Sequence, residues 1–297
     1  MLDQPAEGDG PSLTAKPRQA EKSAARSRKS PDTTDEKGVV SRVVSVMWAL
    51  SEHETFMPLG QIADLCGLSA STAHRLLKQL ADLGMIARGP QRRYCLGPEF
   101  HYMASLIEAR SQFVQASMPY MREAVRQLGH TCFVSLYLPT KQSRSAIAKI
   151  DPVEPPRVAA TVRESRSLLW GSSGRSILAY LPSDTIAQIL DKAQPSPGSG
   201  RRPPTLQSLM RSLREIQARG YAISHGELEH DVVGMAVPIF GPDHKIVGNL
   251  AIAERKSRWN KDSERLVSTV LMQQAAMIAL HLGQPARPAF PFTATTG

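Results

Sequence analysis

The sequence lacks the features of a secreted, membrane-spanning or disulfide-bonded protein. No uninterrupted apolar run approaches the roughly 18 residues of a membrane span, and the N-terminus has no apolar core of a secretory signal. Only three cysteines occur, Cys66, Cys95 and Cys132, and none stands in a Cys-x-x-Cys pair. Their odd number and their scatter argue against a disulfide framework or a zinc ribbon, so we expect a cytoplasmic protein with no membrane contact.

The chain is basic, but the excess charge is not gathered in one segment. Its 297 residues allow two domains with separate cores, and its formal net charge of +9 favours an anionic partner. Residues 1–38 carry seven Lys/Arg and seven Asp/Glu, whereas residues 39–97 carry six against four. Residues 1–38 also have few large apolar side chains, which predicts a disordered tail. Its basic residues leave two alternatives open, an arm along DNA phosphates or a solvated tail without a role.

Residues 60–84 show the pattern of two helices joined by a tight turn. The first helix stops at Gly67 and carries on one face Ile62, Ala63 and Leu65. Ser69 can cap the second helix, which ends at Gly84. The apolar residues at helical spacing in that second helix are Ala73, Leu76, Leu77, Leu80 and Leu83. The pattern predicts a helix-turn-helix, whose second helix can enter a DNA major groove.

A basic hairpin is expected directly after these helices. Met85–Ala87 and Tyr94–Leu96 flank the basic residues 88–93, which indicates the wing of a winged helix-turn-helix, and a helix over Val39–Leu50 would close the small core. Local cations, rather than the net charge, favour DNA binding here. The residues expected to contact an operator in double-stranded DNA are Ser69, Ser71, Thr72, His74, Arg75, Lys78, Arg88, Arg92 and Arg93.

Some of these residues have a second interpretation. Arg75 can form a bidentate pair with guanine, or it can merely pair with a phosphate or a carboxylate. Ser69 can serve only as a helix cap. At the wing, phosphate contact by Arg92 or Arg93 is favoured over a free solvated tip, because the tip flanks the DNA-facing helix.

The second half of the chain changes to strand periodicity. Residues 99–128 are helical in pattern, and Pro119 is expected to break them into a linker helix and the first helix of a second domain. Strands are expected at residues 131–138, 145–150, 157–162, 232–240 and 245–253. Helices are expected at residues 174–180, 184–192, 205–219 and 261–282, the last with Leu266, Val267, Val270, Leu271 and Ile278 facing inward. The fold class is therefore α+β, with an antiparallel sheet flanked by helices.

Several segments together resemble the IclR family of bacterial transcriptional regulators, over about residues 39–283. Leu68–Leu77 looks like the family's recognition-helix motif and Tyr94–Gly97 like the end of its wing. Three further segments resemble family signatures, namely Gly174–Pro182, Gly220–Glu227 and Val233–Phe240. The resemblance implies a winged helix-turn-helix joined by a linker helix to a GAF-like effector domain, in dimers or in tetramers made of two dimers.

The resemblance also implies a function and an order of domains. The implied function is a ligand-responsive repressor or activator of an operon, catabolic in kind, with a small organic acid or an aromatic metabolite as effector. The expected segments are a disordered tail at 1–38, the DNA-binding domain at 39–98, the linker helix at 99–117, the effector-binding domain at 118–283 and a flexible tail at 284–297.

Residues 170–174 are the most suggestive stretch of the second domain. Small residues before a helix start leave room for a ligand, and free amides there attract a carboxylate. Trp170 could wall an apolar pocket or simply pack. The residues expected to bind the effector are Trp170, Ser172, Ser173, Ser224, His225, Glu227, Gly234, Met235, Ala251 and Ala253.

Two departures from the family pattern affect these expectations. Ala70 stands where relatives often carry a basic residue, so one DNA contact is expected to be missing. Ala251 and Ala253 lie on the strand where some relatives place hydroxyls that hold a small carboxylic acid. This allows a larger or more apolar effector.

Enzymatic and metal-binding alternatives find little support in the sequence. Residues 225–230 miss the His-x-x-Glu-His spacing, and residues 171–174 miss the Gly-x-Ser-x-Gly nucleophile elbow. We therefore expect no metal, no cofactor and no catalytic residue. Two rivals remain, a hydrolase using Ser172, His225 and Glu227, and a DNA-binding protein without a ligand.

Overall fold

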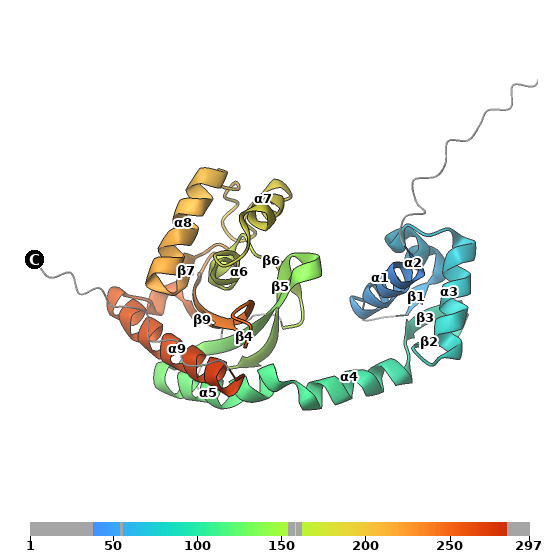
Figure 1. Ribbon diagram of the computed structural model, residues 1–297, viewed down its shortest axis with the longest axis horizontal. Coiled ribbons are helices and arrows are strands. Elements are labelled where there is room, and N and C mark those ends of the chain that lie inside the picture. Colours follow the sequence, from blue (N-terminus) through green and yellow to red (C-terminus); the bar gives the residue numbers. More distant parts are fainter. Residues whose placement is uncertain (1–37, 54–55, 154–157, 159–161, 284–297) are drawn as a thin grey trace, which may run out of the picture. The chain divides into compact units, whose positions relative to one another are not determined.

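The computed structural model describes residues 38–53, 56–153, 158 and 162–283, which divide into two compact units (Figure 1). The division falls between His101 and Tyr102. The predicted fold class is confirmed, with a winged helix-turn-helix in unit 1 and an antiparallel sheet flanked by helices in unit 2. The predicted tails and the strand predicted at 157–162 lie largely outside the described residues, and the domain limits drawn from the sequence stay predictions.

Unit 1 is built from three helices and a small antiparallel sheet. The helices are α1 (Val39–Ser51), α2 (Leu59–Cys66) and α3 (Ala70–Asp82). The strands lie in the order β1 (Met57–Pro58), β3 (Arg93–Leu96) and β2 (Ile86–Arg88). Their shared core contains Val46, Leu50, Met57, Ile62, Leu77, Leu80, Ile86 and Tyr94. Burial of these side chains holds α3 against the hairpin.

The helix-turn-helix forms as predicted, with two differences in its buried face. Gly67 ends α2 in the left-handed conformation (φ +63°), and Ser69 caps α3. Leu65 and Leu83 were expected to be buried but are 58% and 68% exposed. Leu65 lies in the last turn of α2, two residues before the Gly67 cap. Leu83 follows the last turn of α3, where the chain leaves the helix axis.

The helical break between the linker and the second domain does not occur at Pro119. One helix, α4, spans Pro98–Arg110, and the next, α5, spans Gln112–Leu128 with Pro119 inside it. The break lies at Ser111, whose hydroxyl caps α5. Packing of the buried face of α5, including Met121 and Ala124, outweighs the hydrogen bond that a proline removes.

Unit 2 contains one six-stranded sheet in which every neighbouring pair is antiparallel. The strands lie in the order β6 (Ser165–Ser167), β5 (Ser143–Ile150), β4 (Thr131–Leu138), β9 (Ile246–Arg255), β8 (Val232–Phe240) and β7 (Ala222–His225). The four central strands were predicted. The edge strands β6 and β7 were missed, because segments this short and polar carry no clear alternation.

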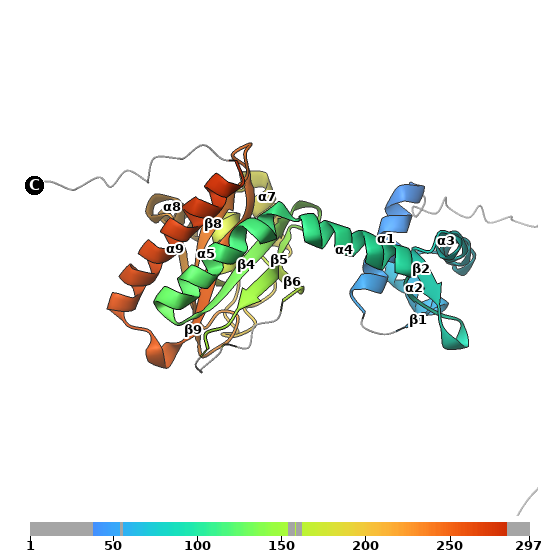
Figure 2. The ribbon, with the colours of Figure 1, turned by 90° about the horizontal axis from the view of Figure 1, so that it is seen from below.

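Helices cover both faces of this sheet (Figures 1 and 2). One face packs on α5 and α9 (Lys261–His281) through a core that includes Val134, Leu250 and Leu271. The other face and β7 pack on α6 (Gly171–Leu178), α7 (Ser183–Asp191) and α8 (Leu206–Arg219). Short 3-10 turns occur at Pro90–Arg92, Pro139–Lys141 and Lys256–Arg258.

The final helix departs from prediction at one position. Val267, Val270, Leu271 and Ile278 of α9 are buried as expected, whereas Leu266 is 57% exposed. Leu266 takes no part in the core that α9 shares with the sheet and α5. Among the described residues, no helix combines the length and apolarity needed to cross a membrane.

The close approach of the wing to α3 predicts a sharp difference between two glycines of unit 1. A Cβ on Gly97 would lie 2.1 Å from the Gly84 carbonyl oxygen, so Gly97→Ala should destabilise the unit by about 1–3 kcal/mol. Gly60 lies in α2 with open space around it, so Gly60→Ala should be neutral or slightly stabilising. Urea unfolding measures both, and equal stabilities of the two variants would contradict this packing.

Candidate DNA interface and ligand cavity

The recognition helix α3 presents one buried and one exposed face. The buried face consists of Ala73, Leu76, Leu77 and Leu80. The exposed face includes Ser71, His74, Arg75 and Lys78. These exposed residues are spaced by one, three or four positions, so they form a single polar stripe. A helix with this arrangement can present its side chains to base edges in a major groove.

The hydroxyls at the start of α3 form a small cluster around Ser69. The Ser69 Oγ accepts a hydrogen bond from the Thr72 amide at 3.2 Å and donates one to Thr72 Oγ1 at 2.8 Å. The Ser71 Oγ lies 3.1 Å from the same Ser69 oxygen. Ser69 is therefore a helix cap, as predicted, and Thr72 is half-buried. Of the three hydroxyls, that of Ser71 is the most accessible to a partner.

The wing carries three exposed arginines on a short hairpin. Ile86 pairs with Leu96 and Arg88 with Tyr94, and the Gly89 amide donates to the Arg93 carbonyl at 2.8 Å. A 3-10 turn at Pro90–Arg92 forms the tip. Arg88, Arg92 and Arg93 all expose their side chains.

The cations of α3 and the wing are not neutralised locally. In the part of the chain that the structure describes, no ion pair is found for Arg75, Lys78, Arg88, Arg92 or Arg93. An acidic neighbour would compete with a phosphate for these groups. The surface therefore offers five unpaired positive charges to a polyanion.

Unit 2 contains a cavity of about 90 Å³ between the sheet and the N-terminal end of α6. Several water-sized volumes fit into this space. Its walls consist of Phe133, Ser135, Arg144, Ala146, Val158, Arg166, Ser172, Ser173, Ser224, Glu227, Leu228, Glu229, Val232, Gly234, Ile252 and Ala253. The mixture of apolar and polar groups in a partly open cavity is typical of a small-molecule site.

The cavity brings together six of the ten residues that the sequence singled out for an effector. They are Ser172, Ser173, Ser224, Glu227, Gly234 and Ala253. The other four lie elsewhere. Trp170, Met235 and Ala251 are buried in packed cores, and His225 is exposed at a separate depression beside Trp259.

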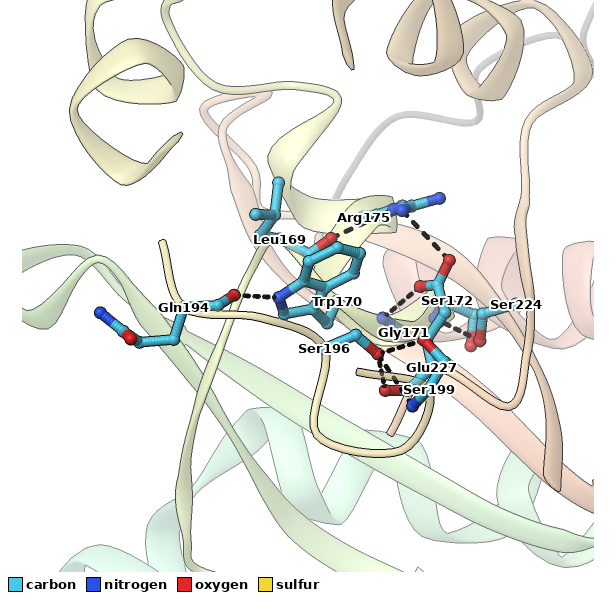
Figure 3. A network of polar contacts seen from close by, with 10 residues as sticks. All are labelled: Leu169, Trp170, Gly171, Ser172, Arg175, Gln194, Ser196, Ser199, Ser224 and Glu227. Atoms are coloured by element: carbon cyan, nitrogen blue, oxygen red, sulfur yellow. Dashed lines mark hydrogen bonds and ion pairs between the residues drawn. The ribbon is translucent and has the colours of Figure 1, made fainter. Parts of the chain in front are cut away.

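Glu227 organises one wall of the cavity (Figure 3). Its Oε2 accepts a hydrogen bond from the Gly171 amide at 2.9 Å, and its Oε1 lies 3.1 Å from the Arg175 guanidinium. The Ser172 amide donates to the Ser224 Oγ at 2.9 Å. Two amides at the start of α6, which the sequence suggested as free carboxylate donors, are therefore bonded to the protein's own side chains.

The loop at residues 193–204 is fastened to the same wall (Figure 3). Ser196 donates through its hydroxyl to the Glu227 carbonyl, which also accepts from the Gly198 amide at 2.9 Å. The Trp170 indole nitrogen donates to the Gln194 carbonyl at 2.8 Å. Trp170 thus serves as a buried packing residue that anchors this loop, the second of the two roles that its sequence context allowed.

Sequence reasoning missed the residues on the opposite wall. Arg144 on β5 and Arg166 on β6 are directly paired in the sheet, and Ser135 on β4 and Phe133 lie on the same face. Burial, and secondarily the charge of Arg166, lowers the pKa of Arg144 to about 10. The sequence shows an arginine among small residues at this position. Its burial could not be predicted from that, because it depends on β4 and β6, which lie on either side of β5.

The cavity does not assemble the hydrolase alternative. Ser172 faces the cavity while His225 lies at the other depression, and no hydrogen bond joins them among the described residues. The Glu227 carboxylate is already bonded to Gly171 and Arg175. Within the described ranges, no group of three or more His, Cys, Asp or Glu is placed to hold a metal ion.

Comparisons with known proteins match both units. Residues 39–90 match the model of the IclR helix-turn-helix domain, and residues 108–280 match that of the bacterial transcriptional regulator IclR C-terminal domain. The HTH-type transcriptional regulator KipR of Bacillus subtilis is 25% identical over 78% of this chain and 92% of its own. The regulator XynR of Escherichia coli is 26% identical over 83% of this chain and 98% of its own.

Solved structures show the same arrangement of elements. A putative IclR transcriptional regulator from Silicibacter sp. TM1040 has a TM-score of 0.77 at 25% identity, covering 86% of this chain and 100% of its own. An IclR homologue from Microbacterium hydrocarbonoxydans, solved in complex with 4-hydroxybenzoate, has a TM-score of 0.66 at 21% identity, covering 82% and 98%. The domain models together span most of the described residues, and the C-terminal model alone matches more than half of the chain. The chain belongs to the IclR family of bacterial transcriptional regulators.

Proposed function

We propose that this chain binds one operator sequence specifically and that a small molecule in the unit 2 cavity changes its affinity for that operator. The observation that carries the proposal is the separation of two sites in one chain. Unit 1 holds a basic stripe on α3 and the wing without ion pairs among the described residues, and unit 2 holds a partly open cavity of about 90 Å³. A protein with a DNA-reading unit and a ligand-sized cavity can couple the two by differential binding to two states.

The DNA contacts divide by position on unit 1. Ser71, His74, Arg75 and Lys78 on the exposed stripe of α3 would reach base edges or nearby phosphates. Arg88, Arg92 and Arg93 of the wing would bind phosphates, which position the protein without reading sequence. Ser69 and Thr72 would support this surface from the helix cap.

The effector would be a small organic acid or an aromatic metabolite. The polar groups that would orient it include Ser172, Ser173, Ser224 and Glu227, and the small residues Gly234 and Ala253 leave the space that it needs. The Microbacterium homologue was solved in complex with an aromatic acid, 4-hydroxybenzoate. A related ligand class is therefore a reasonable first screen for this chain.

A dimer would place two recognition helices in successive major grooves of a pseudo-palindromic operator. Supporting this, α1 exposes an apolar stripe of Val40, Val44 and Trp48, spaced by four residues. Exposed apolar stripes on a helix are typical of a protein–protein contact. We propose a homodimer, or a dimer of dimers, in which the linker segment (residues 99–117), made of α4 and the start of α5, joins the DNA-binding domain (39–98) to the effector domain (118–283).

Arg75→Ala and Arg92→Ala should weaken DNA binding in different ways. Loss of a base contact at Arg75 should reduce the preference for operator over random DNA by about 5- to 150-fold, or about 1–3 kcal/mol. Loss of a phosphate contact at Arg92 should weaken both DNAs equally and reduce the salt slope by about 0.9. Fluorescence anisotropy across a salt series measures both, using the promoter of the chain's own operon.

The matched control for these variants is Arg211→Ala, because Arg211 is exposed on α8 in unit 2. It should leave operator affinity unchanged. If wild type bound every DNA sequence equally weakly, the sequence-specific regulator would be abandoned.

Ala253→Leu should abolish the ligand response without abolishing operator binding. The added side chain would fill the cavity, whereas Ala218→Leu adds the same atoms to the exposed surface of α8. We expect the ligand-induced rise in Tm to disappear in Ala253→Leu and to persist in Ala218→Leu. Differential scanning fluorimetry with organic acids and aromatics tests this, and an unchanged response of Ala253→Leu would place the effector elsewhere.

A further inference from the structure

Arg144 is a buried cation without a described partner. It is the second residue of β5, only 5% of the residue is exposed, and it lines the cavity. Its Nε has no hydrogen-bond partner, and no ion pair or hydrogen bond of its guanidinium is found within the described residues. Buried charges in folded proteins are normally paired, because an unpaired one forfeits its hydration without compensation.

A neighbouring residue adds a second positive charge beside Arg144. Arg166, its direct partner across β5 and β6, adds a second positive charge, and only Arg166 has an acidic partner, Glu164 at 2.8 Å. With its pKa lowered to about 10, Arg144 still carries its charge at neutral pH. This wall of the cavity therefore holds one buried positive charge that no described acidic group compensates.

A second unsatisfied group lies on the neighbouring strand. Ser135 is 1% exposed, lines the same cavity, and its Oγ has no hydrogen-bond partner among the described residues. Ser135 is paired with Ala146, two residues from Arg144 on the same face of β5. A guanidinium can span the distance between such diagonal neighbours. A guanidinium and a hydroxyl thus line the same cavity without an acceptor among the described residues.

The acidic residues of the cavity do not neutralise this wall. The Glu227 carboxylate is bonded to Gly171 and Arg175 on the opposite side. Glu229 is only half-buried, so water can solvate its charge. The remaining walls near Phe133, Val158 and Leu228 are apolar.

We propose that Arg144 and Ser135 form the carboxylate-binding end of the cavity and select an effector with one carboxylate on a small apolar body. The inference rests on the proposed function, in which this cavity holds the effector. An Arg–carboxylate pair with a supporting hydroxyl would compensate the buried charge only when the ligand is present. Ligand binding would then remove the largest electrostatic cost of the unliganded cavity.

The first test needs no knowledge of the natural effector. In the full-length protein without ligand, Arg144→Met should raise Tm by roughly 2 °C or more, because an unpaired buried charge is replaced by an apolar side chain of similar length. Arg211→Met on the exposed surface of α8 is the control and should leave Tm unchanged. A fall in Tm of Arg144→Met would assign Arg144 a structural partner and overturn the proposal.

The second test compares acids with their uncharged amides at constant ionic strength. The probes are acetate with acetamide, propionate with propionamide, and benzoate with benzamide. At least one acid should stabilise the wild type more than its amide does. Arg144→Met should weaken the binding of that acid at least about tenfold, with a smaller loss in Ser135→Ala and partial binding in Arg144→Lys. The proposal is overturned if no acid exceeds its amide, or if Arg144→Met binds the acid as wild type does.

Operator binding separates this proposal from the one on which it rests. If an uncharged ligand changed operator affinity equally in wild type and Arg144→Met, the sensor function would stand and the carboxylate site would fall. If wild type showed no specific operator binding, the proposed function would fail whatever the acid titrations gave.

Discussion

The cavity depends on one buried carboxylate, that of Glu227. Its two oxygens hold the start of α6 through Gly171 and Arg175, and its backbone carbonyl holds the 193–204 loop through Ser196 and Gly198. Three segments far apart in the sequence thus meet at one residue of the β7–β8 turn. Because the charge of Glu227 is paired and hydrogen-bonded, its burial is compatible with a stable fold. Both oxygens of the Glu227 carboxylate in this wall already have partners within the protein.

The opposite wall of the cavity contains buried polar groups without hydrogen-bond partners among the described residues. Arg144 and Ser135 are as deeply buried as Glu227, yet their donor groups have no acceptor among the described residues. Glu227 in one wall of the cavity is therefore hydrogen-bonded and ion-paired, whereas Arg144 and Ser135 in the facing wall have unpaired groups among the described residues. In the proposed site the ligand would be positioned by groups that have no partner among the described residues, whereas the groups that stabilise the fold would take no part in recognition.

Unit 1 separates stability from recognition in a similar way. Leu77, Leu80 and Ile86 are buried, so the helix and the hairpin are held from within. Arg75 and Arg92 take no part in that core and carry no local ion pair among the described residues. Their charge is available to DNA because packing needs none of it. In the proposed dimer, the exposed apolar face of α1 would be the surface through which two copies align these helices.

The amino-acid sequence by itself determined the elements with strong periodicity. Apolar spacing, the Ser69 cap and the glycines at the helix ends were enough for α2, α3 and the wing, and β-branched residues bounded by Pro, Gly and Asp were enough for β4 and β8. These signals are local, so they survive in a single sequence. Tertiary packing alone decided that Pro119 continues a helix, that Leu65, Leu83 and Leu266 face solvent, and that Arg144 is buried. The depth of a side chain and the lack of a partner depend on distant segments, which local periodicity does not encode.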